Sequence, residues 1–249
     1  MGLKARFKAS FSDDTLFYNL LAVAYGAATL SRSRLRAAFR RILRSGVFYR
    51  EEELYMCSLL PEALLDVVLA ELNPRSVLDV GCGIGRTLVY LAERGVDALG
   101  VEASKLAIAR SPIANRIVRA DLRRPIDLGR YFDVVWSYEV AEHIHARFTD
   151  VFLQTLARHG DRIVMSAARP GQPGEGHFNL QPPEYWIERM ARCSFQLDKA
   201  LTARLQATSD QFAPNMMGFV RVGRHGRDEP RHHDQEAAGL TDSRWNNAR

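Results

Sequence analysis

An acid followed by three closely spaced glycines is the strongest chemical signal in the chain. The run Ser76–Leu88 reads S-V-L-D-V-G-C-G-I-G-R-T-L and holds Asp79, Gly81, Gly83 and Gly85. Glycines accept positive φ angles and leave backbone N–H groups uncovered, so a ligand can lie across such a turn. The spacing does not match the dinucleotide pattern G-x-G-x-x-G, and no Gly-Lys-Ser/Thr closes a phosphate-binding loop. The turn could therefore take another nucleotide-like molecule, or it could be a tight turn without a ligand.

Two further acids follow later apolar runs. Glu102 ends the run Asp97–Glu102, and Asp121 lies near the end of Arg116–Leu122. The carboxyl ends of parallel strands are where such sheets bind ligands. A carboxylate at that place can accept two hydrogen bonds from a ribose diol, which is the role we expect of Glu102. Any one of these acids could instead cap a helix, but acids at the ends of three successive strands favour a ligand site.

The motif L-D-V-G-C-G-I-G over Leu78–Gly85 resembles the first motif of the class I S-adenosylmethionine-dependent methyltransferases. The resemblance implies that the glycines pass under the methionine and ribose of S-adenosylmethionine, and that the strand-end acid orients this cofactor. A carboxylate suits a cofactor that carries an ammonium and a sulfonium group. The resemblance also implies that Asp121 contacts the adenine amino group. The cofactor-binding residues that follow from it are Asp79, Gly81, Cys82, Gly83, Gly85, Glu102, Asp121, Leu122 and Ser137.

Four other side chains could act on a methyl acceptor: Glu139, Glu142, His143 and His177. The first three stand at i, i+3 and i+4, so we expect them on one helical face. Methyl transfer from a sulfonium is an in-line displacement, and a base or metal is needed only if the acceptor must lose a proton. His143 or His177 could be that catalytic base. Alternatively, the two acids satisfy a helix start and His143 packs locally.

The string E-x-x-E-H resembles that of ubiquinone-biosynthesis O-methyltransferases and of small-RNA 3′-end 2′-O-methyltransferases. The resemblance implies a divalent cation such as Mg²⁺ bound by Glu139, Glu142 and His143, with His177 completing the set. Such an ion would hold the acceptor hydroxyl and lower its pKa. A metal site, a metal-free base and a purely structural role are thus all open.

The segment His177–Trp186 loosely resembles one found in methyltransferases of glycan and secondary-metabolite pathways. Asn179 and Gln181 could bond sugar hydroxyls while Tyr185 and Trp186 stack on a ring, or the two aromatic residues could be helix core.

Composition narrows the class of protein. The chain has 249 residues, 47% hydrophobic and 25% charged, which fits one globular domain with extensions. The net charge of +5 suggests an anionic partner, such as a phospholipid surface, nucleic acid or phosphorylated substrate, or simply a basic surface. Cys57, Cys82 and Cys193 form no C-x-x-C pair and indicate neither a zinc site nor a disulfide framework, so we expect a reducing, cytoplasmic compartment. The apolar run 16–30 is shorter than the roughly 20 residues of a membrane helix, so we expect no transmembrane segment.

Hydrophobic periodicity predicts strands that alternate with helices, which indicates an α/β fold. The resemblance implies that this fold is a Rossmann-like class I methyltransferase with a seven-stranded, mostly parallel sheet flanked by helices. We expect an N-terminal helical cap over 1–53, the methyltransferase domain over 54–222 and a disordered tail over 223–249. Within the cap, the basic amphipathic helix 31–44 could make peripheral membrane contact or pack on the domain. A helix is expected over Glu51–Leu72 and a strand over Phe195–Ala200.

The function expected from these features is methylation of a hydroxyl on a small molecule or glycan. The alternatives are an RNA 2′-O-methyltransferase with a divalent metal and a non-catalytic cofactor-binding or scaffold protein. No RNA-binding module accompanies the basic N-terminal helix.

Overall fold

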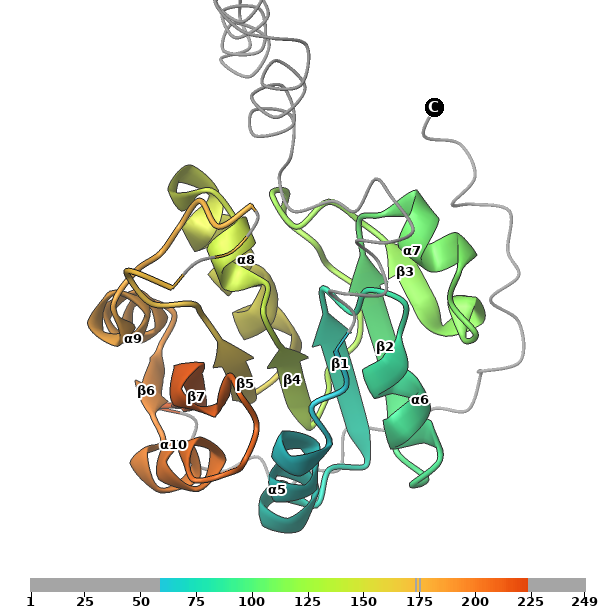
Figure 1. Ribbon diagram of the computed structural model, residues 1–249, viewed down its shortest axis with the longest axis horizontal. Coiled ribbons are helices and arrows are strands. Elements are labelled where there is room, and N and C mark those ends of the chain that lie inside the picture. The colour runs from blue at the N-terminus through green and yellow to red at the C-terminus, as the bar shows by residue number, and fades with distance from the viewer. Residues whose placement is uncertain (1–58, 173, 175, 224–249) are drawn as a thin grey trace, which may run out of the picture.

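The computed structural model describes residues 59–172, 174 and 176–223, which form a sheet covered by helices on both faces (Figure 1). The seven strands run in the order β3-β2-β1-β4-β5-β7-β6. The strands are β1 (Ser76–Val80), β2 (Asp97–Glu102), β3 (Ile117–Arg119), β4 (Val134–Ser137), β5 (Arg162–Ser166), β6 (Phe195–Leu197) and β7 (Met216–Arg221). The α-helices are α5 (Glu62–Leu72), α6 (Arg86–Ala92), α7 (Lys105–Ala109), α8 (Thr149–His159), α9 (Pro183–Arg192) and α10 (Lys199–Gln206). Short 3-10 helices are η1 (Ala114–Arg116), η2 (Ala141–His143), η3 (Ala146–Phe148) and η4 (Ala213–Asn215).

The sheet is parallel except at one strand. β1 pairs in parallel with β2 and β4, whereas β7 runs antiparallel to both β5 and β6. The chain order reverses between β1 and β4, so the crevice outside their carboxyl ends is the expected ligand position in an open α/β sheet. The predicted seven-stranded class I methyltransferase fold, with its last strand antiparallel, is confirmed. The helical cap over 1–53 and the tail beyond Gly223 lie outside the described residues.

Alternate side chains of the central strands pack against different helices. Val77 belongs to a core shared with α5, α6 and α10, while Leu78 and Val80 belong to a core shared with α8 and α9. All five residues of β1 are buried, which is expected of a central parallel strand covered on both faces. The two cores hold the strand ends in fixed register, and the polar residues at those ends are therefore held in place.

Pro61 shortens the helix predicted over Glu51–Leu72. We expected a continuous helix over Glu51–Leu72, but residues 59 and 60 are not helical and α5 begins at Glu62. Proline lacks a backbone N–H and disfavours helical φ/ψ in the residue before it, so a helix is expected to begin after it rather than run through it. Residues 51–58 lie outside the described part of the chain.

The strand predicted over Phe195–Ala200 is wrong in its second half. β6 ends at Leu197, and α10 begins at Lys199. Asp198 caps this helix, with its side chain accepting a hydrogen bond from the Leu201 N–H at 3.0 Å. The apolar residues Leu201 and Leu205, four apart, are buried on one side of α10, a pattern that indicates a helix.

Strands β3 and β4 are shorter than the strands expected from the apolar runs Arg116–Leu122 and Tyr131–Glu139. Phe132, for example, only forms an isolated bridge with Gly160 before β4 begins. Within the described residues, no helix is long and apolar enough to span a bilayer.

Candidate cofactor and acceptor site

The glycine turn links β1 to α6, and its backbone conformation favours glycine at three positions. Gly81, Gly83 and Gly85 have φ angles of 87°, 56° and 79°, which side chains rarely tolerate. A Cβ at Gly81 would also lie 2.4 Å from Cγ2 of Val140, a residue that follows β4. The Gly81 N–H donates to the Val101 carbonyl at 2.8 Å, which ties the turn to β2. The predicted positive φ angles are confirmed, and the backbone of this turn lies at the carboxyl edge of the sheet.

Glu102 fastens the same turn from the end of β2. Its Oε2 accepts a hydrogen bond from the Gly83 N–H at 2.9 Å, and its Oε1 accepts one from the Ser104 N–H at 2.7 Å. Burial raises the pKa of Glu102, and these backbone donors counteract that effect. Each carboxylate oxygen has a second lone pair, so the group can still accept from a ribose diol.

Asp79 lies at the end of β1, only 3% exposed. Burial, followed by the charge of Glu102, raises the pKa of Asp79 to about 8. The two carboxyl groups are therefore close enough to interact, as the sequence predicted. A buried pair of acids beside uncovered backbone is an environment that a cationic ligand would relieve.

Cys82 and Ser137 make contacts within the protein. The Cys82 thiol packs on β2, where a Cβ at Gly100 would meet it at 2.5 Å. The Ser137 hydroxyl donates to the Val80 carbonyl at 2.9 Å and links β4 to β1. Both residues support the glycine turn, and their assignment to the cofactor stays a prediction.

Asp121 follows β3 at the same edge, next to the buried Leu122. Its carboxylate forms a two-point ion pair with Arg123, with both nitrogen–oxygen distances at 2.8 Å. Burial raises the pKa of Asp121, but the Arg123 hydrogen bonds outweigh it and the net pKa is lowered. Asp121 is thus an ionised acid with an ion-pair partner, unlike Asp79.

Glu139 and Glu142 follow β4, but not on one helical face. Glu139 has a φ of 54° and precedes η2, so the expected single helical face is wrong. Left-handed backbone at a non-glycine residue is strained and is often found at functional sites. Glu139 is anchored to β5: its N–H donates to Ser166 Oγ at 2.6 Å, and that hydroxyl donates to Glu139 Oε1 at 2.9 Å.

Glu142 is fully buried, and neither carboxylate oxygen has a hydrogen-bond partner. Burial first, then repulsion from Glu139, raises its pKa well above the usual value, and the nearby backbone N–H groups of Glu142 and Ala168, which lack hydrogen-bond geometry, counteract this only in part. An unpaired buried carboxyl group is costly, so a ligand, proton or cation at this position would stabilise the protein.

The loop after β5 brings His177 to His143. The Glu142 carbonyl accepts hydrogen bonds from the N–H groups of Phe178 and Asn179 at 2.9 and 3.0 Å, which fixes the loop to η2. The two imidazole rings then meet edge to face, with centroids 5.0 Å apart. His143 Nδ1 bonds the Gly176 carbonyl at 3.0 Å. Burial, aided by His177, lowers the pKa of His143 to about 4, and burial also lowers the pKa of His177.

Glu142, His143 and His177 each present one ligand atom within 4.8 Å of the others, which makes them a cluster that could hold a metal ion. Glu139, the fourth predicted ligand, is not part of this cluster. The sequence predicted three of the members, although its helical argument for their proximity was wrong.

The residues considered for sugar binding mostly serve the fold. Asn179 Nδ2 donates to Thr149 Oγ1 at 3.0 Å, and Asn179 Oδ1 accepts from Gln181 at 3.2 Å. Trp186 is fully buried in the core under α9. For Trp186 the helix-core alternative is therefore confirmed.

Sequence reasoning missed Asp210 and Asn215, which lie close to Glu139, and Phe212, whose ring contacts Tyr138. Asp210, Phe212 and Asn215 precede β7, and because β7 is antiparallel, its first residue meets the carboxyl end of β5. The sequence signal that could have pointed to Asn215 is a polar residue directly before the buried strand β7.

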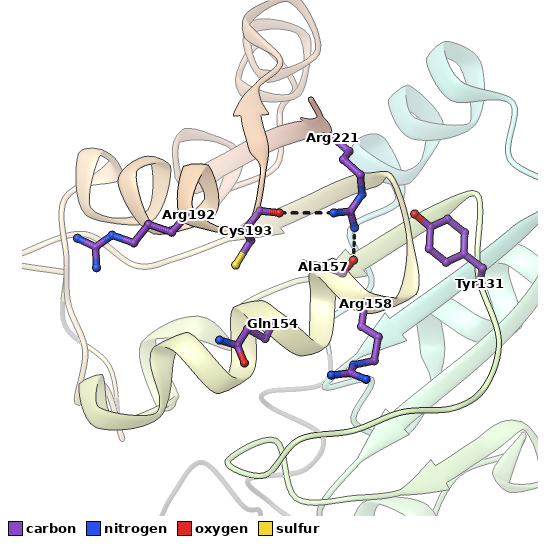
Figure 2. A pocket seen from close by; sticks show the side chains of 7 residues that line it. All are labelled: Tyr131, Gln154, Ala157, Arg158, Arg192, Cys193 and Arg221. Atoms are coloured by element: carbon purple, nitrogen blue, oxygen red, sulfur yellow. Dashed lines mark hydrogen bonds between the residues drawn. The ribbon is translucent and has the colours of Figure 1, made fainter. Parts of the chain in front are cut away.

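A pocket of about 420 Å³ opens elsewhere, near the amino-terminal ends of β4 and β5 (Figure 2). It is lined by Tyr131, Gln154, Ala157, Arg158, Arg192, Cys193 and Arg221. Its arginines already have partners: Arg158 pairs with Asp127 at 3.0 Å, and Arg192 with Glu188 at 2.6 Å. Arg221 points to the Ala157 carbonyl (Figure 2). This pocket contains none of the strand-end acids, so we place the candidate site at the carboxyl edge.

The strand order, the antiparallel β7 and the glycine turn after β1 define a class I methyltransferase fold. A family profile described as a methyltransferase domain matches residues 49–162. This match covers just under half of the chain, and together with the fold it supports a class I S-adenosylmethionine-dependent methyltransferase.

Curated relatives match part of the chain. A ubiquinone biosynthesis O-methyltransferase of Sinorhizobium medicae is 39% identical over 88 residues, which cover 32% of this chain and 35% of the relative. A probable chloroplastic tocopherol O-methyltransferase of Oryza sativa subsp. japonica is 33% identical over 127 residues, covering 46% of this chain and 33% of the relative. The chain thus spans about a third of the length of these relatives.

Solved structures share the fold. A sugar N-methyltransferase from Streptoalloteichus sp. ATCC 53650 has a TM-score of 0.55 at 19% identity, covering 70% of this chain and 94% of that one. A Burkholderia thailandensis 1,6-didemethyltoxoflavin-N1-methyltransferase, solved with S-adenosylhomocysteine, has a TM-score of 0.51 at 18% identity. The match covers 68% of this chain and 81% of that one. At this identity the likeness concerns the fold alone.

Proposed function

We propose that the protein transfers a methyl group from S-adenosylmethionine to a hydroxyl group of a small molecule or glycan. The observation that carries the proposal is the buried pair of acids, Asp79 and Glu102, beside a glycine turn at the carboxyl edge of the sheet. The two O-methyltransferase relatives support oxygen as the acceptor atom.

The residues fit S-adenosylmethionine in both shape and charge. The turn at Gly81 and Gly83 leaves no side chain over the backbone, so the methionine part of the cofactor can approach closely. Asp79 would face the cationic part, and Glu102 would accept hydrogen bonds from the ribose while still holding the turn. Asp121 would serve the adenine end.

The cluster of Glu142, His143 and His177 lies beyond β4, at the reversal of strand order where we expect the acceptor to lie beside the cofactor. Its chemistry fits a divalent cation: one carboxylate lacks any partner, and the Gly176 carbonyl engages Nδ1 of His143 and leaves its Nε2 for a ligand. A bound cation would lower the pKa of an acceptor hydroxyl. Without a cation, the neutral imidazole of His143 or His177 could itself accept the hydroxyl proton.

Binding and transfer assays test the proposal together. Calorimetry with S-adenosylmethionine and S-adenosylhomocysteine should give binding at one site, and Asp79→Asn should weaken it. Radiolabelled methyl transfer to phenols, simple glycosides and RNA 3′ ends should then give product with a phenol or glycoside.

Other outcomes point elsewhere. Transfer only to RNA ends would support the RNA 2′-O-methyltransferase instead. Cofactor binding without transfer to any acceptor class would support a non-catalytic binding protein. Absence of cofactor binding would contradict the proposal.

A further inference from the structure

Asn215 is the last residue before β7, at the edge of the sheet where the acids gather. In the antiparallel pairing, Met216 lies opposite Ser166 at the carboxyl end of β5. The Asn215 carbonyl accepts a hydrogen bond from the Ala167 N–H at 3.4 Å. Its backbone is therefore part of the sheet edge, and the place of its side chain is fixed by the fold.

The side chain of Asn215 is buried without hydrogen bonds. It is only 2% exposed, and neither Oδ1 nor Nδ2 has a partner. Asn179, which is equally buried, has both amide atoms paired. Buried amides are normally satisfied, and an unpaired one lowers stability. Apart from its effect on the nearby Glu139 carboxylate, the Asn215 amide forms no side-chain hydrogen bond that would stabilise the fold.

The Asn215 amide lies next to Glu139, one of the two acids that follow β4. It lies against the Glu139 carboxylate closely enough to favour the charged form of Glu139, although neither amide atom has hydrogen-bond geometry. Glu139 in turn is held in strained backbone next to Glu142. Asn215 is thus adjacent to the acids that follow β4.

Two aromatic rings lie beside these polar groups. Tyr138 stacks on Trp136 with centroids 5.8 Å apart, and Phe212 meets Tyr138 edge to face at 6.1 Å. The Tyr138 hydroxyl is fixed by Asp210 at 2.9 Å. Tyr138 and Phe212 are half-buried, so they can contact the apolar part of a small molecule.

We propose that Asn215 binds a hydroxyl group of the methyl acceptor and so contributes to acceptor specificity. An amide offers both donor and acceptor atoms, and a hydroxyl group is the neutral partner that uses both. Tyr138 and Phe212 would hold the apolar body of the same molecule. This inference rests on the proposed function, because the acceptor side is defined by the cofactor position.

The test compares phenol with anisole, in which the hydroxyl hydrogen is replaced by methyl. Dissociation constants are measured by NMR titration for the parent protein and for Asn215→Leu, with and without S-adenosylhomocysteine. Because one neutral hydrogen-bonded group is at stake, we expect the parent to prefer phenol about fivefold to tenfold. In Asn215→Leu this preference should fall to about one.

Thermal unfolding separates a binding role from a structural one. Asn215→Leu should lower the unfolding temperature only slightly, because the contact with the Glu139 carboxylate is lost but no hydrogen bond of good geometry is broken. The matched variant Asn179→Leu should unfold at a lower temperature, because it breaks two. If Asn215→Leu does not fold, Asn215→Ala is used in the same titrations.

Three results would overturn the proposal: a parent protein that does not prefer phenol, a preference that survives in the variant, or a loss of stability in Asn215→Leu as large as in Asn179→Leu. The last would mean that an internal water or other structural contact satisfies Asn215. Failure of S-adenosylhomocysteine to bind would instead contradict the proposed function, while the titrations without it still decide the role of Asn215.

Discussion

Asp79 and Glu102 are buried next to each other at the ends of neighbouring parallel strands, yet only Glu102 is fixed by the glycine turn. The backbone N–H groups of Gly83 and Ser104 hydrogen-bond to Glu102. Burial and the Glu102 charge raise the pKa of Asp79 to about 8. Glu102 thus supports the turn, while Asp79 is held in a buried environment that a bound cation would stabilise.

Stability without cofactor should therefore fall as the pH rises from about 4 to about 8. In that range the unfolded chain, with an aspartate pKa of about 3.9, has released a proton that folded Asp79 retains. Asp79→Asn should remove this slope and raise the free energy of unfolding at pH 8 by at least about 1 kcal/mol. It should also weaken S-adenosylmethionine binding about tenfold. Denaturant unfolding at several pH values and calorimetry measure the two effects.

Asp97→Asn is the matched control, because Asp97 makes the stability depend on pH in the opposite direction to Asp79. Burial raises the pKa of Asp97, but ion pairs with Arg130 and Arg116 outweigh it and the net pKa is lowered. The stability that Asp97 contributes is present above about pH 4 and lost as the pH falls further. A pH profile of Asp79→Asn that parallels the parent would contradict the assignment.

Gly81 should be the glycine of the turn whose replacement costs most. Gly81→Ala meets both a positive φ of 87° and a Val140 methyl at 2.4 Å. Gly95→Ala has a similar φ of 77° but open space, so it measures the backbone cost alone, about 1–2 kcal/mol. The loss of stability in Gly81→Ala should exceed that in Gly95→Ala by about 1 kcal/mol or more, because of the added clash with Val140.

A double-mutant cycle isolates the steric part. Val140→Ala in the Gly81→Ala background should recover the excess over Gly95→Ala but not the backbone cost. Equal destabilisation by Gly81→Ala and Gly95→Ala would show that the turn shifts away from Val140 at no cost.

The sequence predicts this edge of the sheet well because its signals are local. A buried strand, the strand-end acid Asp79 and the glycine turn lie within Ser76–Gly85, and Glu102 ends the next apolar run, so local patterns place both acids without knowledge of the tertiary contacts. The approach of Val140 to Gly81 and of Asn215 to Glu139 depends on strand order, which no local pattern encodes. The helical face assigned to Glu139 failed for a related reason: the link to Ser166 on β5 holds its backbone in a left-handed conformation.

The helix α10 was missed because the short strand β6 runs into it after one residue. Asp198→Ala should cost about 1 kcal/mol, since it removes the N-cap hydrogen bond to Leu201. Asp198 also pairs with Arg162 at 3.4 Å, but Arg162 is partly exposed and the ion pair should contribute little. Asp198→Ser keeps a cap without the charge and should retain most of the stability in chemical denaturation. A serine variant as unstable as the alanine variant would assign the effect to the ion pair.

Metal binding by Glu142, His143 and His177 can be measured apart from catalysis. Calorimetric titration of the parent protein with Zn²⁺ or Mg²⁺ should show one site, and Glu142→Gln should weaken it at least about tenfold because an anionic ligand is lost. His145→Ala changes an exposed histidine two residues beyond His143 and should leave the titration unchanged.

Without metal, Glu142→Gln should unfold at a higher temperature than the parent, because it removes a buried carboxyl group that lacks a partner and is repelled by Glu139. The same substitution would then stabilise the free protein and weaken the ion complex, which distinguishes a ligand from a structural acid. A parent protein that binds neither cation, and transfers methyl groups equally well with chelator, would leave the neutral imidazoles as the base. In that case His143→Gln and His177→Gln should each lower methyl transfer about a hundredfold or more, with S-adenosylmethionine affinity unchanged.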